Sequence, residues 1–112
     1  MPEFRIVLTW EAIYDLTDIA DYIEDEFGIS RADYFQKEIK KELEMLTVLR
    51  EAFPKTQIMY RGYVIHKKPF PPSIVFYVID DQTKEIHILR VLREERDWKR
   101  IMSNQHEYSY PD

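Results

Sequence analysis

The 112-residue sequence predicts a single α+β domain in which two helices pack on one face of an antiparallel sheet. The first half carries apolar residues at helical spacing, whereas the second half carries apolar runs of strand length. Short connections separate the last three of these runs, and such connections join antiparallel neighbours. The predicted order of elements is therefore β-α-α-β-β-β.

A short strand and a helix open the domain. Residues 4–9 alternate weakly between apolar and polar and predict the strand. Thr9 is suited to cap the helix that follows, and Gly28 is well placed to end it. The apolar positions of this helix recur at helical spacing at Leu16, Ile19, Ala20, Ile23 and Phe27.

A second helix follows directly. Residues 30–33 resemble a capping box, with Ser30 as the cap. The helix is expected to stop before Pro54, because the residue preceding a proline avoids helical angles. Its apolar stripe consists of Ala32, Phe35, Ile39, Leu43 and Leu46.

The remaining elements are predicted strands. Residues 60–67 alternate and form the first of them, and the prolines at 69, 71 and 72 then predict a loop. Residues 73–80 (SIVFYVID) are apolar on both faces, as a central strand is. Residues 81–84 form a turn into the last strand, which begins at Glu85.

The most informative tract is EIHILRVLREERDW, residues 85–98. Its apolar residues predict a buried strand, and Arg90, Arg93 and Arg96 lie at or just past the end of that strand. A guanidinium group bonds phosphate or carboxylate bidentately, so the tract indicates both a fold and an anion-binding region. Residues 93–102 are expected to hold a short helix. The domain is assigned to residues 1–102, and residues 103–112 are expected to form a flexible tail.

Composition narrows the class of protein. The net charge is −5, but acids concentrate in the first helix and bases where the strands lie. The chain has no cysteine, no apolar run of membrane-spanning length and no signal-peptide pattern, so a cytoplasmic location without membrane contact is expected. His66, His87 and His106 are scattered, so neither a metal site nor a cofactor is predicted.

Several candidate site residues have two interpretations. Arg90 either binds an anion or pairs with an acid across the sheet. Arg93 and Arg96 are functional candidates, although they also fit a solvated helix start with internal salt bridges. Trp98 either packs over the end of the sheet or stacks on a base.

The strand at residues 60–67 and its continuation raise a further choice. Arg61, Lys67 and Lys68 lie among aromatic residues, which is the composition of an RNA-contacting surface. Lysines at a sheet edge also simply deter aggregation. His66 is a weak candidate for a general base, since an isolated histidine is more often structural.

Five segments together resemble the RelE/ParE superfamily of bacterial toxins from type II toxin–antitoxin systems. They are AIYDLTDIADYI, ELEMLTVL before Pro54, YRGYVIHK, IVFYVID and ILRVLREERDW. The resemblance covers residues 4–102 and rests on the order and spacing of the segments. It implies a compact domain with a curved antiparallel sheet, a role in growth inhibition or plasmid stabilisation, and an antitoxin as partner.

The superfamily divides by target. RelE-like members cut mRNA in the ribosome without a metal, whereas ParE-like members poison DNA gyrase. Ser73 stands where cleaving relatives commonly carry an arginine, and Glu94 and Glu95 would repel a phosphate. These departures favour the ParE-like function.

Three hypotheses follow: a gyrase-directed toxin, a ribosome-dependent mRNA endonuclease, and a non-toxic module that retains only antitoxin binding. For the endonuclease, the weak catalytic candidates are His66, Arg61 and Arg93. The candidate target-binding residues are Arg61, Lys67, Lys68, Arg90, Arg93, Arg96 and Trp98.

Overall fold

The computed structural model describes residues 3–112 and confirms an α+β fold. The described elements are β1 (Arg5–Leu8), α1 (Trp10–Phe27), α2 (Ile29–Leu49), β2 (Lys55–Tyr60), β3 (Tyr63–Phe70), β4 (Ser73–Asp80), β5 (Glu85–Arg93) and α3 (Trp98–Asn104). Within the described chain, no helix combines the length and apolarity that crossing a membrane requires.

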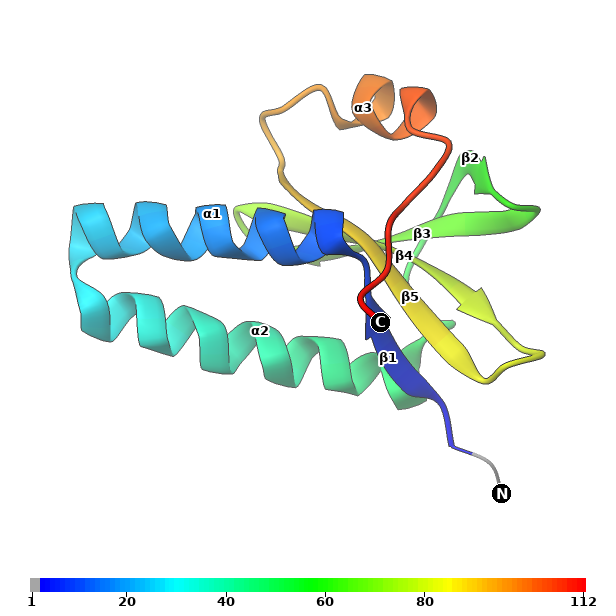
Figure 1. The fold of residues 1–112 in the computed structure, drawn as a ribbon, viewed down its shortest axis with the longest axis horizontal. Helices are drawn as coiled ribbons and strands as arrows, with labels where there is room; N and C mark the ends of the chain where they lie inside the picture. The colour runs from blue at the N-terminus through cyan, green and yellow to red at the C-terminus, as the bar shows by residue number, and fades with distance from the viewer. Residues whose placement is uncertain (1–2) are drawn as a thin grey trace.

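The five strands form one sheet in the order β1-β5-β4-β3-β2 (Figure 1). The last three strands, β3, β4 and β5, pair antiparallel as predicted, and the additional strand β2 pairs antiparallel with β3. Strand β1, however, runs parallel to β5. The sheet is therefore mixed rather than wholly antiparallel. The intervening helices and strands give the chain enough length to return in the parallel direction, which a tight turn cannot do.

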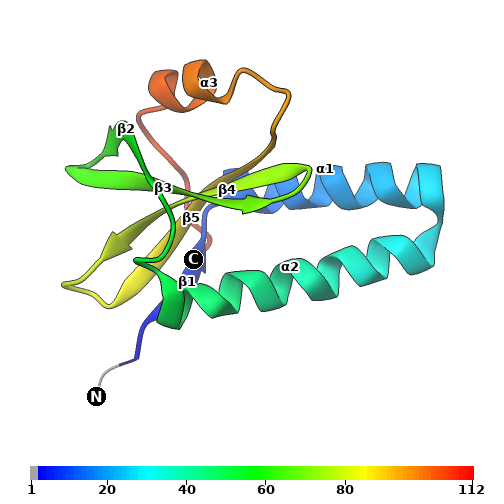
Figure 2. The ribbon, with the colours of Figure 1, turned by 180° about the vertical axis from the view of Figure 1, so that it is seen from behind.

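Side chains pack on both faces of the sheet. Helices α1 and α2 cover one face, where Leu43 and Leu46 of α2 belong to the same core cluster as the buried Val75 and Ile88. Helix α3 and the C-terminal segment cover the other face over Phe76. Figure 2 shows α3 and α2 on opposite sides of the sheet. Burial on both faces explains why β4 reads as a nearly continuous apolar run.

The helical hairpin turns at a single glycine. Thr9 caps α1 as predicted, with its Oγ1 accepting a hydrogen bond from the Ala12 backbone N–H at 2.9 Å. Gly28 ends α1, also as predicted, at a φ of 95° that favours glycine. The predicted capping box at Ser30 is wrong, because Gly28 also serves as the N-cap of α2 and Ser30 already lies inside that helix.

The hairpin of β2 and β3 was not anticipated. Residues 60–67 do not form one strand, because the chain turns at Arg61 and Gly62, whose φ angles are both positive at 51° and 84°. Such two-residue turns join antiparallel strands. The sequence between Pro54 and Tyr60 showed too little alternation to predict the added strand.

The predicted loop at the prolines is also partly wrong, because β3 continues through Pro69 to Phe70. The backbone N–H of Lys67 donates to the Pro54 carbonyl at 2.9 Å, so it faces β2. Pro69 lies two residues further along and faces the same way, beyond the end of β2. Its missing N–H therefore removes no ladder hydrogen bond.

The C-terminal segment is packed rather than loose. Tyr108 is buried in the core beneath α3, and its ring meets that of Tyr60 edge-on at 5.0 Å. The Trp10 N–H donates to the Ser109 carbonyl at 2.8 Å, which ties the segment to the start of α1. Helix α3 begins at Trp98 instead of residue 93 because Asp97 caps it.

The burial of Tyr108 predicts that the C-terminal segment contributes to stability. Tyr108→Ala should lower the free energy of unfolding by about 3 kcal/mol, since it removes a buried aromatic ring. Tyr108→Phe keeps the ring and should cost less than about 1 kcal/mol. Urea unfolding measures both values. Equal stability of the alanine variant and the wild type would contradict the packed arrangement.

Candidate functional site

Arg90 is part of a buried ion pair. Its Nε and Nη2 donate to the two carboxylate oxygens of Asp15 at 2.7 and 3.0 Å, and its Nη1 donates to Gln105 at 2.8 Å. The hydrogen bonds with Asp15 raise the pKa of Arg90 despite its burial. Of the two interpretations of Arg90, the geometry is that of the ion pair.

The carboxylate of Asp15 also accepts a hydrogen bond from the backbone of β5, at a point where the strand pairing is irregular. The register shifts where Phe76 pairs with Arg90 and Tyr77 with Ile88, so Leu89 is the extra residue of a bulge. Asp15 accepts from the Val91 N–H at 2.9 Å, and Thr9 Oγ1 donates to the Leu89 carbonyl at 2.8 Å. Thr9 and the first turns of α1 therefore supply hydrogen-bond partners to the backbone groups of β5 that lie beyond the end of β1.

His66 and Lys68 face α2 and are buried. Only 2% of His66 is exposed; its Nδ1 lies 3.0 Å from the Phe53 carbonyl, and its ring stacks on Tyr77. Lys68 donates to Glu42 at 3.2 Å and lies over the Phe53 ring. Both side chains have partners within the chain and little access to a ligand.

Lys67 points to the opposite side of the sheet. Its Nζ lies 5.1 Å from the centre of the Trp98 ring, and that ring packs on Phe76 at 5.2 Å. Trp98 thus packs over the sheet, while remaining partly exposed beside the exposed Lys99. Arg61 is exposed in the β2–β3 turn, at the other end of β3 from Phe70.

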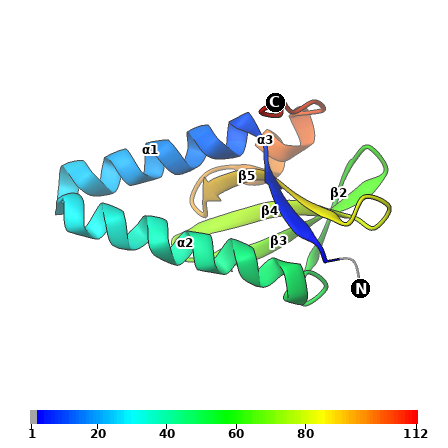
Figure 3. The same ribbon diagram turned by 60° about the horizontal axis from the view of Figure 1, so that its bottom comes forward.

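A groove of about 750 Å³ lies between the helical hairpin and the end of the sheet, and we call it the hairpin groove. The hairpin projects past the sheet at this end (Figure 3). Arg93 and Arg96 line the groove, as does Ser73. Its other residues are Asp15, Asp18, Ile19, Tyr22, Ile23, Phe27, Arg31, Tyr34, Phe35, Glu38, Phe70, Pro71, Pro72 and Val91.

Guanidinium groups lie over aromatic rings at two places in the hairpin groove. Arg93 lies over the Tyr22 ring at 5.2 Å, and Arg31 lies over the Phe27 ring at 5.7 Å. The exposed fractions of Tyr22, Phe27 and Tyr34 are 47, 60 and 61%, which is high for aromatic residues of a helix. This surface combines apolar area with charges of both signs, from three arginines (Arg31, Arg93, Arg96) and three acids (Asp15, Asp18, Glu38).

Arg93 has unused hydrogen-bonding capacity. Glu95 Oε1 lies 2.8 Å from its Nε, yet this buried Nε makes no hydrogen bond within the described chain. The contact is therefore an ion pair without a directed N–H···O interaction. Because 39% of the Arg93 side chain is exposed, a carboxylate placed in the groove could reach the exposed part of the guanidinium group rather than this buried Nε.

The structure does not bring the predicted site residues together. His66 and Lys68 face α2, Lys67 and Trp98 face α3, and Arg90 is inside. Arg61 lies at one end of the sheet, whereas Arg93 and Arg96 lie at the groove. Three groove aromatics of the hairpin, Tyr22, Phe27 and Tyr34, were not among the predicted site residues; Phe27 was expected only as an apolar position of the first helix, yet it is 60% exposed. Tyr22 and Tyr34 lie outside the apolar stripes of their helices, which is the signal that could have identified them.

Comparisons with known proteins agree with this fold. The model of a family described as the ParE toxin of the type II toxin–antitoxin system parDE matches residues 6–98. A solved chain of the chromosomal ParDE toxin–antitoxin system from P. aeruginosa is similar, with a TM-score of 0.68 and 21% identity. The match covers 83% of this chain and 98% of that one, and at this identity it shows the fold alone. None of the curated proteins compared with the sequence matches it.

The Arg90–Asp15 pair predicts a loss of stability when either partner is removed. Arg90→Ala and Asp15→Ala should each lower the free energy of unfolding by about 3 to 5 kcal/mol, because each leaves a buried charge unpaired. Arg93→Ala, which removes a partly exposed group, is the matched control and should change it by less than about 1 kcal/mol. If urea unfolding showed equal costs for Arg90→Ala and Arg93→Ala, the structural role of Arg90 would be refuted.

Proposed function

Because the chain belongs to the ParE toxin family of type II toxin–antitoxin systems, we propose that it inhibits DNA gyrase by binding and is neutralised by an antitoxin in the hairpin groove. The proposal has two parts, which rest on different surfaces. The first concerns the target and the second concerns the partner.

The observation that carries the first part is the burial of His66, the predicted proton acceptor, and of the basic residue Lys68, whereas Arg61 is exposed. A metal-free ribonuclease needs basic groups on the scissile phosphate and an accessible proton acceptor. His66 and Lys68 are 2% and 3% exposed, and Arg90 is engaged by Asp15. Groups committed to the protein's own structure are poor catalysts, which supports inhibition by binding over mRNA cleavage.

The surface around α3 is the best candidate for target contact. Trp98, Lys67 and Lys99 combine a partly exposed aromatic ring with two cations near it. Aromatic and cationic groups dominate the energetics of many protein interfaces. In this proposal Arg61 contributes a further positive charge to target binding from the neighbouring β2–β3 turn.

The hairpin groove suits a segment of the antitoxin. Its exposed rings Tyr22, Phe27 and Tyr34 offer apolar anchoring sites, and Arg93 and Arg96 offer charge at one end. An amphipathic segment that inserts apolar residues and places a carboxylate by Arg93 would satisfy both features. Neutralisation would then be binding at a surface separate from α3.

The target proposal predicts inhibition of purified gyrase. The protein should block supercoiling and stabilise the cleavage complex, and Lys99→Glu should weaken inhibition about tenfold or more by reversing a charge beside Trp98. Lys37→Glu, on the outside of α2, is the matched control and should behave as wild type. Primer extension on transcripts from expressing cells provides the opposing test. Cleavage at A-site codons together with unaffected gyrase would overturn the proposal.

The partner proposal predicts where antitoxin affinity arises. Phe27→Ala or Tyr34→Ala should weaken binding of the neighbouring gene's product by about thirtyfold, the effect of losing a buried anchor worth roughly 2 kcal/mol. Val48→Ala removes an even more exposed apolar side chain outside the groove and should leave affinity unchanged. Calorimetry on the purified pair measures this, and equal losses at Phe27 and Val48 would argue against the groove.

A further inference from the structure

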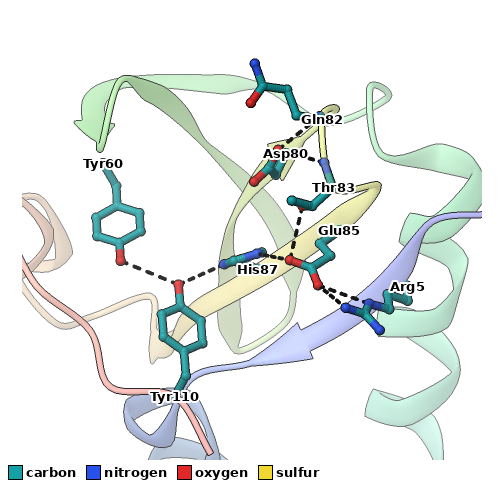
Figure 4. A network of polar contacts seen from close by, with 8 residues as sticks. All are labelled: Arg5, Tyr60, Asp80, Gln82, Thr83, Glu85, His87 and Tyr110. Atoms are coloured by element: carbon teal, nitrogen blue, oxygen red, sulfur yellow. Dashed lines mark hydrogen bonds and ion pairs between the residues drawn. The ribbon is translucent and has the colours of Figure 1, made fainter.

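A cluster of possible metal ligands lies at the β4–β5 turn, on the side of the chain away from the hairpin groove. Asp80 and Glu85 are directly paired across the two strands, and His87 follows Glu85 by two residues on the same face. One ligand atom from each residue lies within 4.8 Å of the other two. Figure 4 shows the three side chains close together.

Each of the three side chains is held from outside the cluster. Asp80 Oδ1 accepts from the backbone N–H groups of Gln82 and Thr83 at 3.0 and 3.2 Å. Glu85 Oε2 accepts from Arg5 Nε at 3.0 Å. His87 Nδ1 lies 2.8 Å from the Tyr110 hydroxyl (Figure 4).

Each side chain has a second potential ligand atom that can face the interior of the cluster: Asp80 Oδ2, Glu85 Oε1 and His87 Nε2. Of these, Glu85 Oε1 also accepts a hydrogen bond from Thr83 Oγ1 at 3.1 Å. At present Glu85 Oε1 and His87 Nε2 lie 3.0 Å apart and share a hydrogen bond. Partners that fix the far side of each ligand, and thereby its orientation, are typical of protein metal sites.

We propose that Asp80, Glu85 and His87 bind a divalent first-row transition-metal ion, with water completing its coordination. Two carboxylate oxygens and one imidazole nitrogen form a mixed ligand set, and the imidazole favours ions such as Zn²⁺ over Mg²⁺ or Ca²⁺. Binding would bring the ligand atoms from their present spacing, within 4.8 Å of one another, to coordination distance. The inference does not depend on the proposed function.

The proton balance of this binding is simple. The metal replaces the hydrogen bond between His87 Nε2 and Glu85 Oε1, so the imidazole carries its proton on Nδ1. That proton is donated to the Tyr110 hydroxyl oxygen.

The register of the sheet places two carboxylates opposite each other in the cluster, and this arrangement favours a cation between them. Like charges directly opposite on neighbouring strands repel each other, and Asp80 and Glu85 are such a pair. Arg5 compensates the charge of Glu85 from the outer side. A divalent ion between the two carboxylates would remove the remaining repulsion and join β4, β5 and the C-terminal segment through Tyr110.

Calorimetric titration of the full chain with ZnCl₂, after chelator treatment and dialysis, tests the proposal. One Zn²⁺ per chain should bind, MgCl₂ at the same concentration should give no saturable heat, and the melting temperature should rise with Zn²⁺. Absence of saturable Zn²⁺ binding would overturn the proposal.

Variants locate the binding. His87→Gln should weaken Zn²⁺ binding at least tenfold, and Tyr110→Phe should weaken it by about tenfold or more, as expected when an outer partner of a histidine ligand is lost. His106→Gln removes an exposed histidine outside the cluster and should leave binding unchanged. If circular dichroism shows His87→Gln to be unfolded, Asp80→Asn decides the matter. Undiminished binding by the folded variant would refute the site.

Discussion

The interaction on which the rest of the structure depends is the contact between α1 and the bulge of β5. Strand β1 pairs with β5 only as far as Ile88, so the rest of that edge of β5 needs other partners. Thr9 and Asp15 supply them at the Leu89 carbonyl and the Val91 N–H. Because Arg90 then joins Asp15 to Gln105, one carboxylate connects the helical hairpin, strand β5 and the C-terminal segment. Such a buried network is stable only when all its members are paired.

This arrangement separates the arginines of the last strand into two kinds. Arg90 has a structural role in the ion pair with Asp15. Arg93 lies three residues further on, where the strand ends beside the projecting hairpin. The bulge also divides the apolar residues between the two cores: Val91 faces the helical hairpin and Leu92 faces α3. The tract that resembles the ParE family thus builds the sheet and then one end of the groove. The tract therefore identifies the fold better than it identifies a chemical activity.

Local patterns predicted the elements whose cause is local. Thr9 and Gly28 mark the ends of α1 through capping and a positive φ, and the run of residues 73–80 marks the central strand. Features that depend on distant partners were not predictable. Pro69 stays in a strand because β2 does not extend past Lys67 to lie beside it. Tyr108 is buried because α3 and Tyr60 leave a space for its ring. Likewise, His87 looked isolated because its neighbour Asp80 comes from another strand.

Hydrogen exchange at the Val91 N–H tests the central role of Asp15 most directly. In the wild type this amide should be among the slowest to exchange, since it is buried and donates to a carboxylate that is itself paired. In Asp15→Ala it should exchange much faster, together with residues 105–110, while amides in the middle of β4 remain slow. Unchanged protection of Val91 in that variant would contradict the account.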